Sequence, residues 1–205
     1  MELAERVGHR LRALREARRL SLSALARRSG IGKATLSRLE SGQRNPTLAT
    51  LYALTTALDA PLSAVLPGPD GDAPPVSGAA VDARLIERRA DRSLVTEAYR
   101  VDIRAGADQR SAAHAPGTYE QLIVLSGTVL VGPVDAPVPV PAGGHLRFAA
   151  DVPHRYRSAG GTAHGILAVH YPVPGGGTGA RDAAGAPAGD KVAANGGQRR
   201  RGRPD

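Results

Sequence analysis

The first residues with an evident chemical use are Lys33, Ala34, Thr35, Ser37 and Arg38. At helical spacing they share one face, and the leucines between them turn to the other. In the major groove of DNA, Arg and Lys side chains donate hydrogen bonds to guanine, and a methyl group contacts thymine. The pattern predicts a helix that reads base edges.

Histidine is concentrated in a later region. Five of the six histidines lie between residues 114 and 170: His114, His145, His154, His164 and His170. Imidazole is both a hydrogen-bonding group and a common metal ligand. This number exceeds what a structural core needs, so we expect some of them to line a pocket.

Residues 21–46 contain the proposed base-reading helix and must position its exposed side chains. Their apolar residues recur at helical spacing on both sides of a break at Gly30, so two short helices bury one common face. Ser21 stands where a side-chain oxygen can cap the first helix, and Gly42 where the second can end in a left-handed residue. The segment predicts a helix-turn-helix.

On these motifs, residues 5–66 resemble the lambda-repressor-like helix-turn-helix domain of the XRE family of bacterial transcriptional regulators. The resemblance implies a bundle of five short helices. It also implies that Arg15 of the first helix pairs with Glu40 at the end of the recognition helix. The expected helices are residues 3–18, 22–28, 33–41, 47–58 and 61–65.

The same resemblance assigns roles at the DNA. Bases are expected to be read by Lys33, Ala34, Ser37 and Arg38. Phosphates are expected to be contacted by Ser21, Gly32, Thr35, Gln43, Arg44 and Asn45. The family usually has Ser or Thr at the position of Gly32, so one helix cap and one phosphate contact are expected to be weaker here.

Charge supports binding to double-stranded DNA. Residues 1–66 carry 11 Lys and Arg against 5 Asp and Glu, a net charge of +6 out of +8 for the whole chain. Cationic side chains that neutralise phosphates release counterions and so favour association. The alternative is a solvated basic face with no role in nucleic-acid binding. One such domain has a small interface, so we expect a homodimer that reads two half-sites.

The composition changes after residue 66. Residues 67–81 are rich in Pro and Gly and are expected to be a flexible linker. Short β-branched runs then follow, at spacings typical of an antiparallel sandwich or barrel over residues 82–172. The expected strands are residues 94–103, 120–125, 128–131, 138–140, 145–148, 154–158 and 163–171.

Two stretches of this region resemble motifs of the cupin superfamily, which implies a double-stranded β-helix. The first runs from His114 through Glu120 to Gly127, and the second from Pro141 to His154. The expected fold class is therefore α + β multidomain, a five-helix bundle followed by an all-β cupin barrel.

The cupin resemblance also implies a pocket at His114, Glu120 and His154. Metal-binding cupins hold a divalent ion with three histidines and one glutamate, ligands that suit Zn, Fe, Mn or Ni. The fourth ligand is missing here. Two readings stay open: three ligands with an open position, or histidines that only form hydrogen bonds in a pocket for a small-molecule effector.

Few aromatic residues are available to line that pocket. Selectivity would rest on the histidines and on Tyr119, Tyr156, Arg147 and Arg155, which favours a small polar or anionic effector. Alternatively, the two arginines cover the outer face of the sheet.

Residues 173–205 have the composition of a disordered basic tail. Residues 201–204, Arg-Gly-Arg-Pro, resemble an AT-hook core, although a tail that attracts DNA without specificity explains them as well. The chain has no cysteine, and no apolar run approaches the length of a membrane span. We expect a cytoplasmic protein without membrane association.

Together these features predict a dimeric, sequence-specific transcriptional regulator whose cupin domain binds a small effector. We assign no catalytic residue. The principal alternative is a metal-dependent cupin enzyme, an oxygenase or isomerase, with an autoregulatory DNA-binding domain. A second alternative is a barrel that only dimerises.

Overall fold

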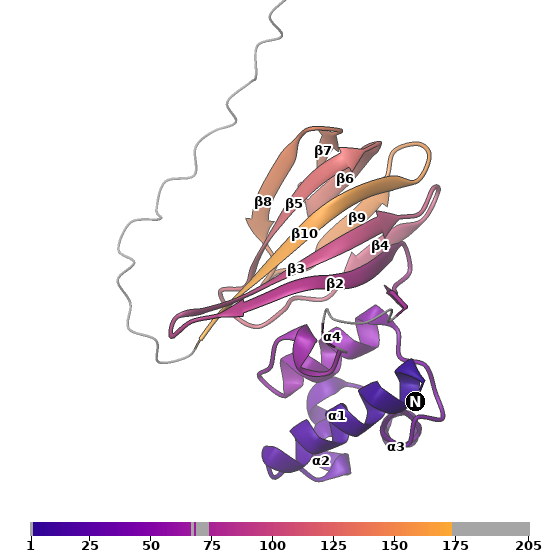
Figure 1. The fold of residues 1–205 in the computed structure, drawn as a ribbon, viewed down its shortest axis with the longest axis vertical. Helices are drawn as coiled ribbons and strands as arrows, with labels where there is room; N and C mark the ends of the chain where they lie inside the picture. Colours follow the sequence, from indigo (N-terminus) through magenta and orange to yellow (C-terminus); the bar gives the residue numbers. More distant parts are fainter. Residues whose placement is uncertain (1, 67, 69–73, 174–205) are drawn as a thin grey trace, which may run out of the picture.

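The computed structural model describes residues 2–66, 68 and 74–173. Helices form one end of the molecule, and two β-sheets form the other (Figure 1). The predicted tail lies outside the described residues except for Val173, and so does its AT-hook-like segment. No helix in the described part of the chain has the length and apolar character needed to cross a membrane.

Four α-helices and one 3-10 helix make up the helical end. Their bounds are α1 Leu3–Ala17, α2 Leu22–Ser29, α3 Lys33–Glu40, α4 Leu48–Ala57 and η1 Leu62–Ala64. The four α-helices agree with prediction to within one residue at either end. The fifth predicted helix, residues 61–65, is instead a single 3-10 turn that begins after Pro61.

Local signals explain the helix ends. The Ser21 hydroxyl accepts a hydrogen bond from the Ala24 amide at 3.1 Å, which caps α2 as predicted. Gly30 and Gly42 follow α2 and α3 with φ of 70° and 72°, a left-handed conformation that glycine adopts without a Cβ clash. The core between these helices consists of buried leucines, among them Leu25 and Leu36.

Among the described residues, ten antiparallel strands form two sheets. One has the strand order β1-β2-β3-β10-β5-β8 and the other the order β4-β9-β6-β7. The bounds are β1 Val76–Ser77, β2 Val81–Ala90, β3 Leu94–Ile103, β4 Asp108–Ser111, β5 Tyr119–Ser126, β6 Thr128–Pro133, β7 Val138–Pro141, β8 His145–Ala149, β9 His154–Ser158 and β10 Ala163–Pro172.

The sequence did not predict β1, β2 and β4. β1 lies inside the segment expected to be a linker, and there Val76 is buried opposite Ala83 of β2. β2 ends in the exposed residues 87–90, three of which are charged, so its second half lacks the alternation of a strand. This half is nevertheless a strand, because β2 pairs with β3 along almost its whole length.

Side chains along each strand of the larger sheet alternate between its inner and its outer face. Along β10 the odd-numbered residues, including Leu167 and Val169, point into the domain, and the even-numbered residues point outward. Val169 lies opposite Glu97 of β3 on one side and Glu120 of β5 on the other. Two carboxylates, Glu97 and Glu120, therefore face the interior in the same row of the sheet.

Candidate functional site

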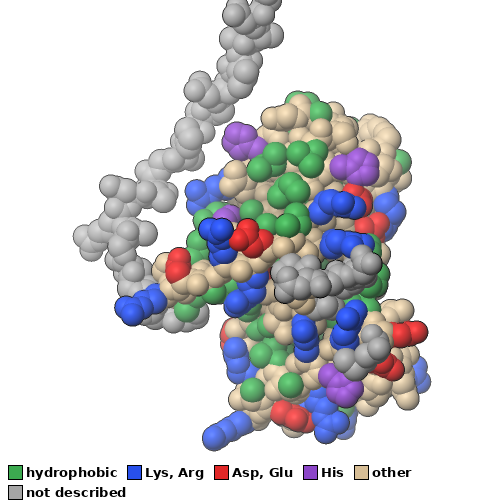
Figure 2. All heavy atoms as spheres, in the orientation of Figure 1, with side chains coloured by type: hydrophobic (Ala, Val, Ile, Leu, Met, Phe, Trp, Pro, Cys, Tyr) green, Lys and Arg blue, Asp and Glu red, His purple; other side chains and the backbone are tan. Residues whose placement is uncertain are grey.

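The predicted DNA-contacting residues lie on the surface of the helix-turn-helix. Thr35 is half-buried. The exposed members are Ser21, Gly32, Lys33, Ala34, Ser37, Arg38, Gln43, Arg44 and Asn45. In the part of the chain that the structure describes, neither Lys33 nor Arg38 takes part in an ion pair. Lys and Arg side chains project from several sides of the helical end (Figure 2).

The recognition helix is fixed from behind by the predicted pair. The Arg15 guanidinium donates to both carboxylate oxygens of Glu40, at 2.7 and 2.8 Å, and to the Leu20 carbonyl at 2.9 Å. These contacts join α1 to the end of α3. As expected from Gly32, no side-chain oxygen caps α3.

A second cluster lies inside the β domain. Glu120 is on β5, His154 is on β9 of the facing sheet, and His114 is on the segment after β4. The three side chains are 1 to 2% exposed. Their potential ligand atoms all lie within 4.8 Å of one another. The structure thus brings together the three residues that the sequence singled out.

Hydrogen bonds hold this cluster. His114 Nε2 is 3.0 Å from Glu120 Oε1, and His154 Nε2 is 3.7 Å from the same oxygen. His154 Nδ1 is 2.9 Å from the Val152 carbonyl oxygen, which fixes its ring. The Tyr156 hydroxyl donates to Glu120 Oε2. His114 Nδ1 is buried without a partner among the described residues.

These contacts set the charge of the cluster. Burial opposes ionisation of Glu120, but the hydrogen bond with His114 and the two imidazoles outweigh it and lower the pKa of Glu120. Burial and the Glu120 carboxylate raise the pKa of Tyr156, so Tyr156 keeps the proton that it donates. The cluster is therefore a carboxylate held by neutral donors and two imidazoles.

Of the two alternatives given for Arg147 and Arg155, the structure agrees with the second, in which both arginines cover the outer faces of the sheets. Arg155 pairs with Asp108 on the outer side of β9 and β4, at 2.8 and 2.6 Å. Arg147 is exposed and lies over the Tyr119 ring, 3.9 Å from its centroid, also on the outside. Of the described residues, no Lys or Arg is buried. The arginines cover the outer faces, and the interior is acidic.

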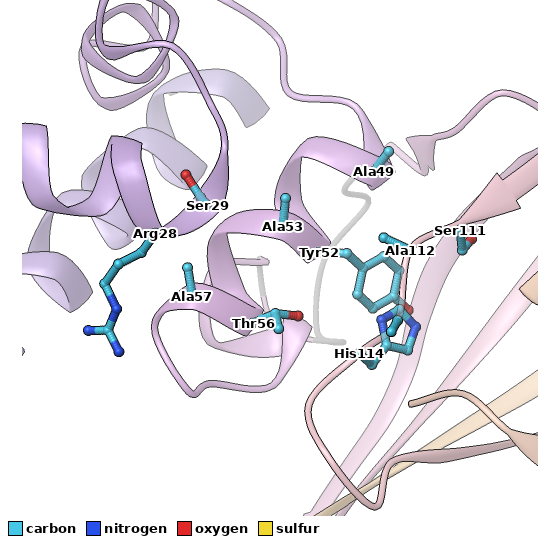
Figure 3. Close-up of a pocket in the computed structure, with 11 residues that line it drawn as sticks. Arg28, Ser29, Ala49, Tyr52, Ala53, Thr56, Ala57, Ser111, Ala112 and His114 are labelled. Carbon is cyan, nitrogen blue, oxygen red and sulfur yellow. The ribbon is translucent and has the colours of Figure 1, made fainter. Parts of the chain in front are cut away.

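The pocket also contains groups that the sequence did not reveal. Tyr52 of α4 stacks on His114, with ring centroids 4.2 Å apart and planes at 24° (Figure 3). The Glu97 carboxylate accepts hydrogen bonds from the Tyr99 hydroxyl at 2.5 Å and from the Ser63 amide at 2.9 Å. In the sequence, Tyr52 looks like an ordinary core residue of a helix. Its contact with His114 depends on how the two domains pack, which the sequence did not reveal.

Comparisons with known proteins find a family model for the helical domain and relatives that extend over the β domain as well. The helix-turn-helix family model HTH_3 matches residues 11–65. The HTH-type transcriptional regulator SutR of Escherichia coli (strain K12) is 33% identical over 173 residues, which cover 83% of this chain and 97% of SutR. The chain belongs to the XRE family of HTH-type transcriptional regulators.

Other members of the family are similar over one or both domains. The crystal structure of an HTH_3 family transcriptional regulator from Vibrio cholerae has a TM-score of 0.71 at 28% identity, and the match covers 83% of this chain and 98% of that one. The HTH-type transcriptional repressor RghR of Bacillus subtilis (strain 168) is 43% identical over 63 residues, 30% of this chain and 47% of RghR. This XRE-family protein is a transcriptional regulator with a helix-turn-helix DNA-binding domain.

Proposed function

We propose that this regulator binds its operator through α3 and that occupation of the pocket in its β domain changes the binding. The observation that carries the second part is the buried cluster of His114, Glu120 and His154. Buried ionisable groups with perturbed pKa values gather at functional sites more often than in ordinary cores. A structural core would be more stable without a buried carboxylate.

At the operator, Lys33, Ala34, Ser37 and Arg38 read bases. Ser21, Gly32, Thr35, Gln43, Arg44 and Asn45 position the domain on phosphates. The exposure of the base-reading residues and the absence of ion pairs at Lys33 and Arg38 among the described residues support this assignment. Phosphate contacts fix register, and base contacts supply specificity.

We assign residues 1–66 to DNA binding and residues 82–172 to effector binding and dimerisation. The β domain is proposed to be a cupin double-stranded β-helix, since its two antiparallel sheets enclose the residues of both cupin-like motifs. A homodimer would place two recognition helices on half-sites about one helical turn apart. Because the target is chromosomal DNA, the protein is proposed to act in the cytoplasm.

The pocket suits a positively charged occupant, and a divalent metal ion fits its donor set. His114, Glu120 and His154 supply two imidazole nitrogens and a carboxylate, ligands that suit Zn, Fe, Mn or Ni. When bound, such an ion would offer open coordination positions to a small-molecule effector. Glu120 anchors the site, and His154 is held in place by its bond to the backbone.

The same three ligands favour one further candidate function, a metal-dependent cupin enzyme with an autoregulatory DNA-binding domain. Three protein ligands with an open position are typical of catalytic metal sites. We prefer the regulator without catalysis because the relatives that cover this chain are named regulators. Turnover of an added organic substrate would favour the enzyme.

Metal content and thermal stability test the pocket directly. Purified wild-type protein and His154→Ala are compared for bound metal, and both are heated with increasing Co²⁺. A ligand that binds only the native state raises stability with its concentration. We expect Co²⁺ to raise the melting temperature of the wild type and not that of His154→Ala. Exposed His145→Gln is the control. Equal responses of the wild type and His154→Ala would contradict a metal site at this cluster.

A further inference from the structure

The pocket of the β domain is closed by a side chain of the DNA-binding domain. The Tyr52 ring lies flat against the His114 ring, with centroids 4.2 Å apart, and reaches it from α4 (Figure 3). Burial raises the pKa of Tyr52, and the Glu120 and Glu97 carboxylates raise it further. The half-buried Tyr52 side chain thus lies between the cleft surface and the histidine of the cluster.

A second contact joins the same two parts. The Ser63 amide, in the 3-10 turn after α4, donates to Glu97 Oε1 at 2.9 Å. Glu97 is 0% exposed, and its other carboxylate oxygen accepts from Tyr99. Glu97 and Glu120 flank Val169 in one row of the inner face. The DNA-binding domain is thus fastened at the pocket itself.

A cleft of about 410 Å³ leads to this place from outside. Alanines of α4, together with Ala112 and Ala113 just before His114, form much of its wall, and Arg28 and Thr56 also line it. The volume is in the range of small-molecule sites. His114 lines the cleft, and its Nδ1 is buried without a partner among the described residues. A small ligand therefore has a route to His114, and the Tyr52 ring stands at the end of that route.

We propose that Tyr52 is a displaceable part of the pocket, so that a loaded pocket and a docked α4 exclude each other. This inference rests on the proposed function of the His114, Glu120 and His154 cluster. An ion with three protein ligands needs room for water or a small ligand at its open positions. The Tyr52 ring covers one face of His114 and lines the cleft that leads to it, so a ligand that enters by the cleft to reach an ion meets this ring. Loading the pocket then releases the helix that orients the reading head.

Release of α4 from the pocket would change binding to the operator. Two reading heads match two half-sites only if their orientation is fixed, so a loosened α4 weakens dimer binding to DNA. Linkage requires the reciprocal effect: operator DNA weakens binding of the pocket ligand by the same factor. In this proposal the coupling passes through Tyr52 and through the contact of Ser63 with Glu97.

The test uses the full chain with Co²⁺ alone as the probe, and follows bound Co²⁺ by visible absorption and docking by hydrogen exchange of the Ser63 amide. In the wild type, saturating Co²⁺ should speed exchange of this amide at least tenfold. Tyr52→Ala should bind Co²⁺ at least tenfold more tightly than the wild type. Tyr52→Phe keeps the ring that covers His114, so this matched variant should behave like the wild type in both measurements.

The possible results separate the role of Tyr52 from the existence of the metal pocket. Equal Co²⁺ affinity of wild type and Tyr52→Ala, or slower Ser63 exchange on loading, would overturn the role of Tyr52 while the pocket stands. Absence of Co²⁺ binding to every variant would overturn the metal pocket and this inference with it, but not DNA binding by α3. The exchange measurement on the wild type decides the matter even if Tyr52→Ala does not fold.

Discussion

Arg15 and Glu40 join α1 to α3 through two parallel hydrogen bonds between a guanidinium and a carboxylate that are 11% and 8% exposed. The Glu40 carboxylate also raises the pKa of Arg15, so the guanidinium stays charged. Because the charges are largely withdrawn from water, removing one partner leaves the other poorly solvated. The pair is a structural support for the recognition helix.

Arg15→Ala should therefore destabilise the helical domain by about 2 to 4 kcal/mol, less than or similar to the loss of a fully buried pair. Urea unfolding followed by helical circular dichroism measures this. Arg15→Lys keeps the charge without the planar fork and should lose part of the stability. Unfolding of Arg15→Ala at the wild-type urea concentration would contradict a supporting role.

Gly8 allows α1 to approach α3 closely. A Cβ at this position would lie 2.3 Å from the Leu39 carbonyl oxygen. Gly-to-Ala changes inside helices usually stabilise by roughly 1 kcal/mol, but here the backbone of α3 would have to move. Gly8→Ala should instead cost about 1 to 3 kcal/mol. The same urea experiment checks this, and a stabilised Gly8→Ala would refute the close approach.

Gly32 leaves the start of α3 without a side-chain cap. Serine at this position accepts a hydrogen bond from a free helix amide, and glycine caps less well by a few tenths of a kcal/mol. Gly32→Ser should raise the free energy of unfolding by about 0.5 kcal/mol and tighten binding to all duplexes alike. Fluorescence anisotropy with operator and random duplexes measures the second effect. Tighter binding to the operator alone would mean that residue 32 reads bases.

His170 predicts a pH dependence. Burial and the nearby Arg147 charge lower the pKa of His170 below 6.5. The unfolded chain therefore takes up this proton at a higher pH than the folded protein. Stability should be greatest above about pH 6.5 and fall as the pH drops from there through the folded pKa.

Melting temperatures of the wild type and His170→Gln between pH 5 and 8, an interval chosen to span the histidine pKa range of about 6.5, measure this slope. The variant should lose the part of the slope that His170 contributes. His145→Gln, an exposed histidine of the same sheet, is the control. A variant as pH-sensitive as the wild type would show that His170 is not the responsible group.

The helical domain was predictable because its signals are local. Caps such as Ser21, breaks such as Gly30 and leucine spacing each depend on a few neighbouring residues. The pairing of Arg15 with Glu40 followed from the family resemblance and is confirmed by the structure. In contrast, the fifth predicted helix is a single 3-10 turn, and residues 61–65 carry no cap or break of this kind that would set its type.

The pocket was predictable only in part. His114, Glu120 and His154 belong to recognisable motifs, and the structure brings them together. Tyr52 and Glu97 carry no motif, since one lies on an ordinary helix face and the other on an alternating strand. Their roles depend on how the two domains pack. The sequence left two alternatives open for Arg147 and Arg155, because the direction of a strand side chain follows from the register of the sheet.

The central claim is that side chains of α3 read a DNA sequence. Selection from a random duplex library at moderate salt, with wild type, Lys33→Ala and Arg38→Ala in parallel, tests it most directly. We expect the wild type to enrich two half-sites about one helical turn apart, and each variant to lose preference at one base pair per half-site, a change of about 1 to 3 kcal/mol. A wild type that enriches nothing, or variants with unchanged preferences, would contradict the claim.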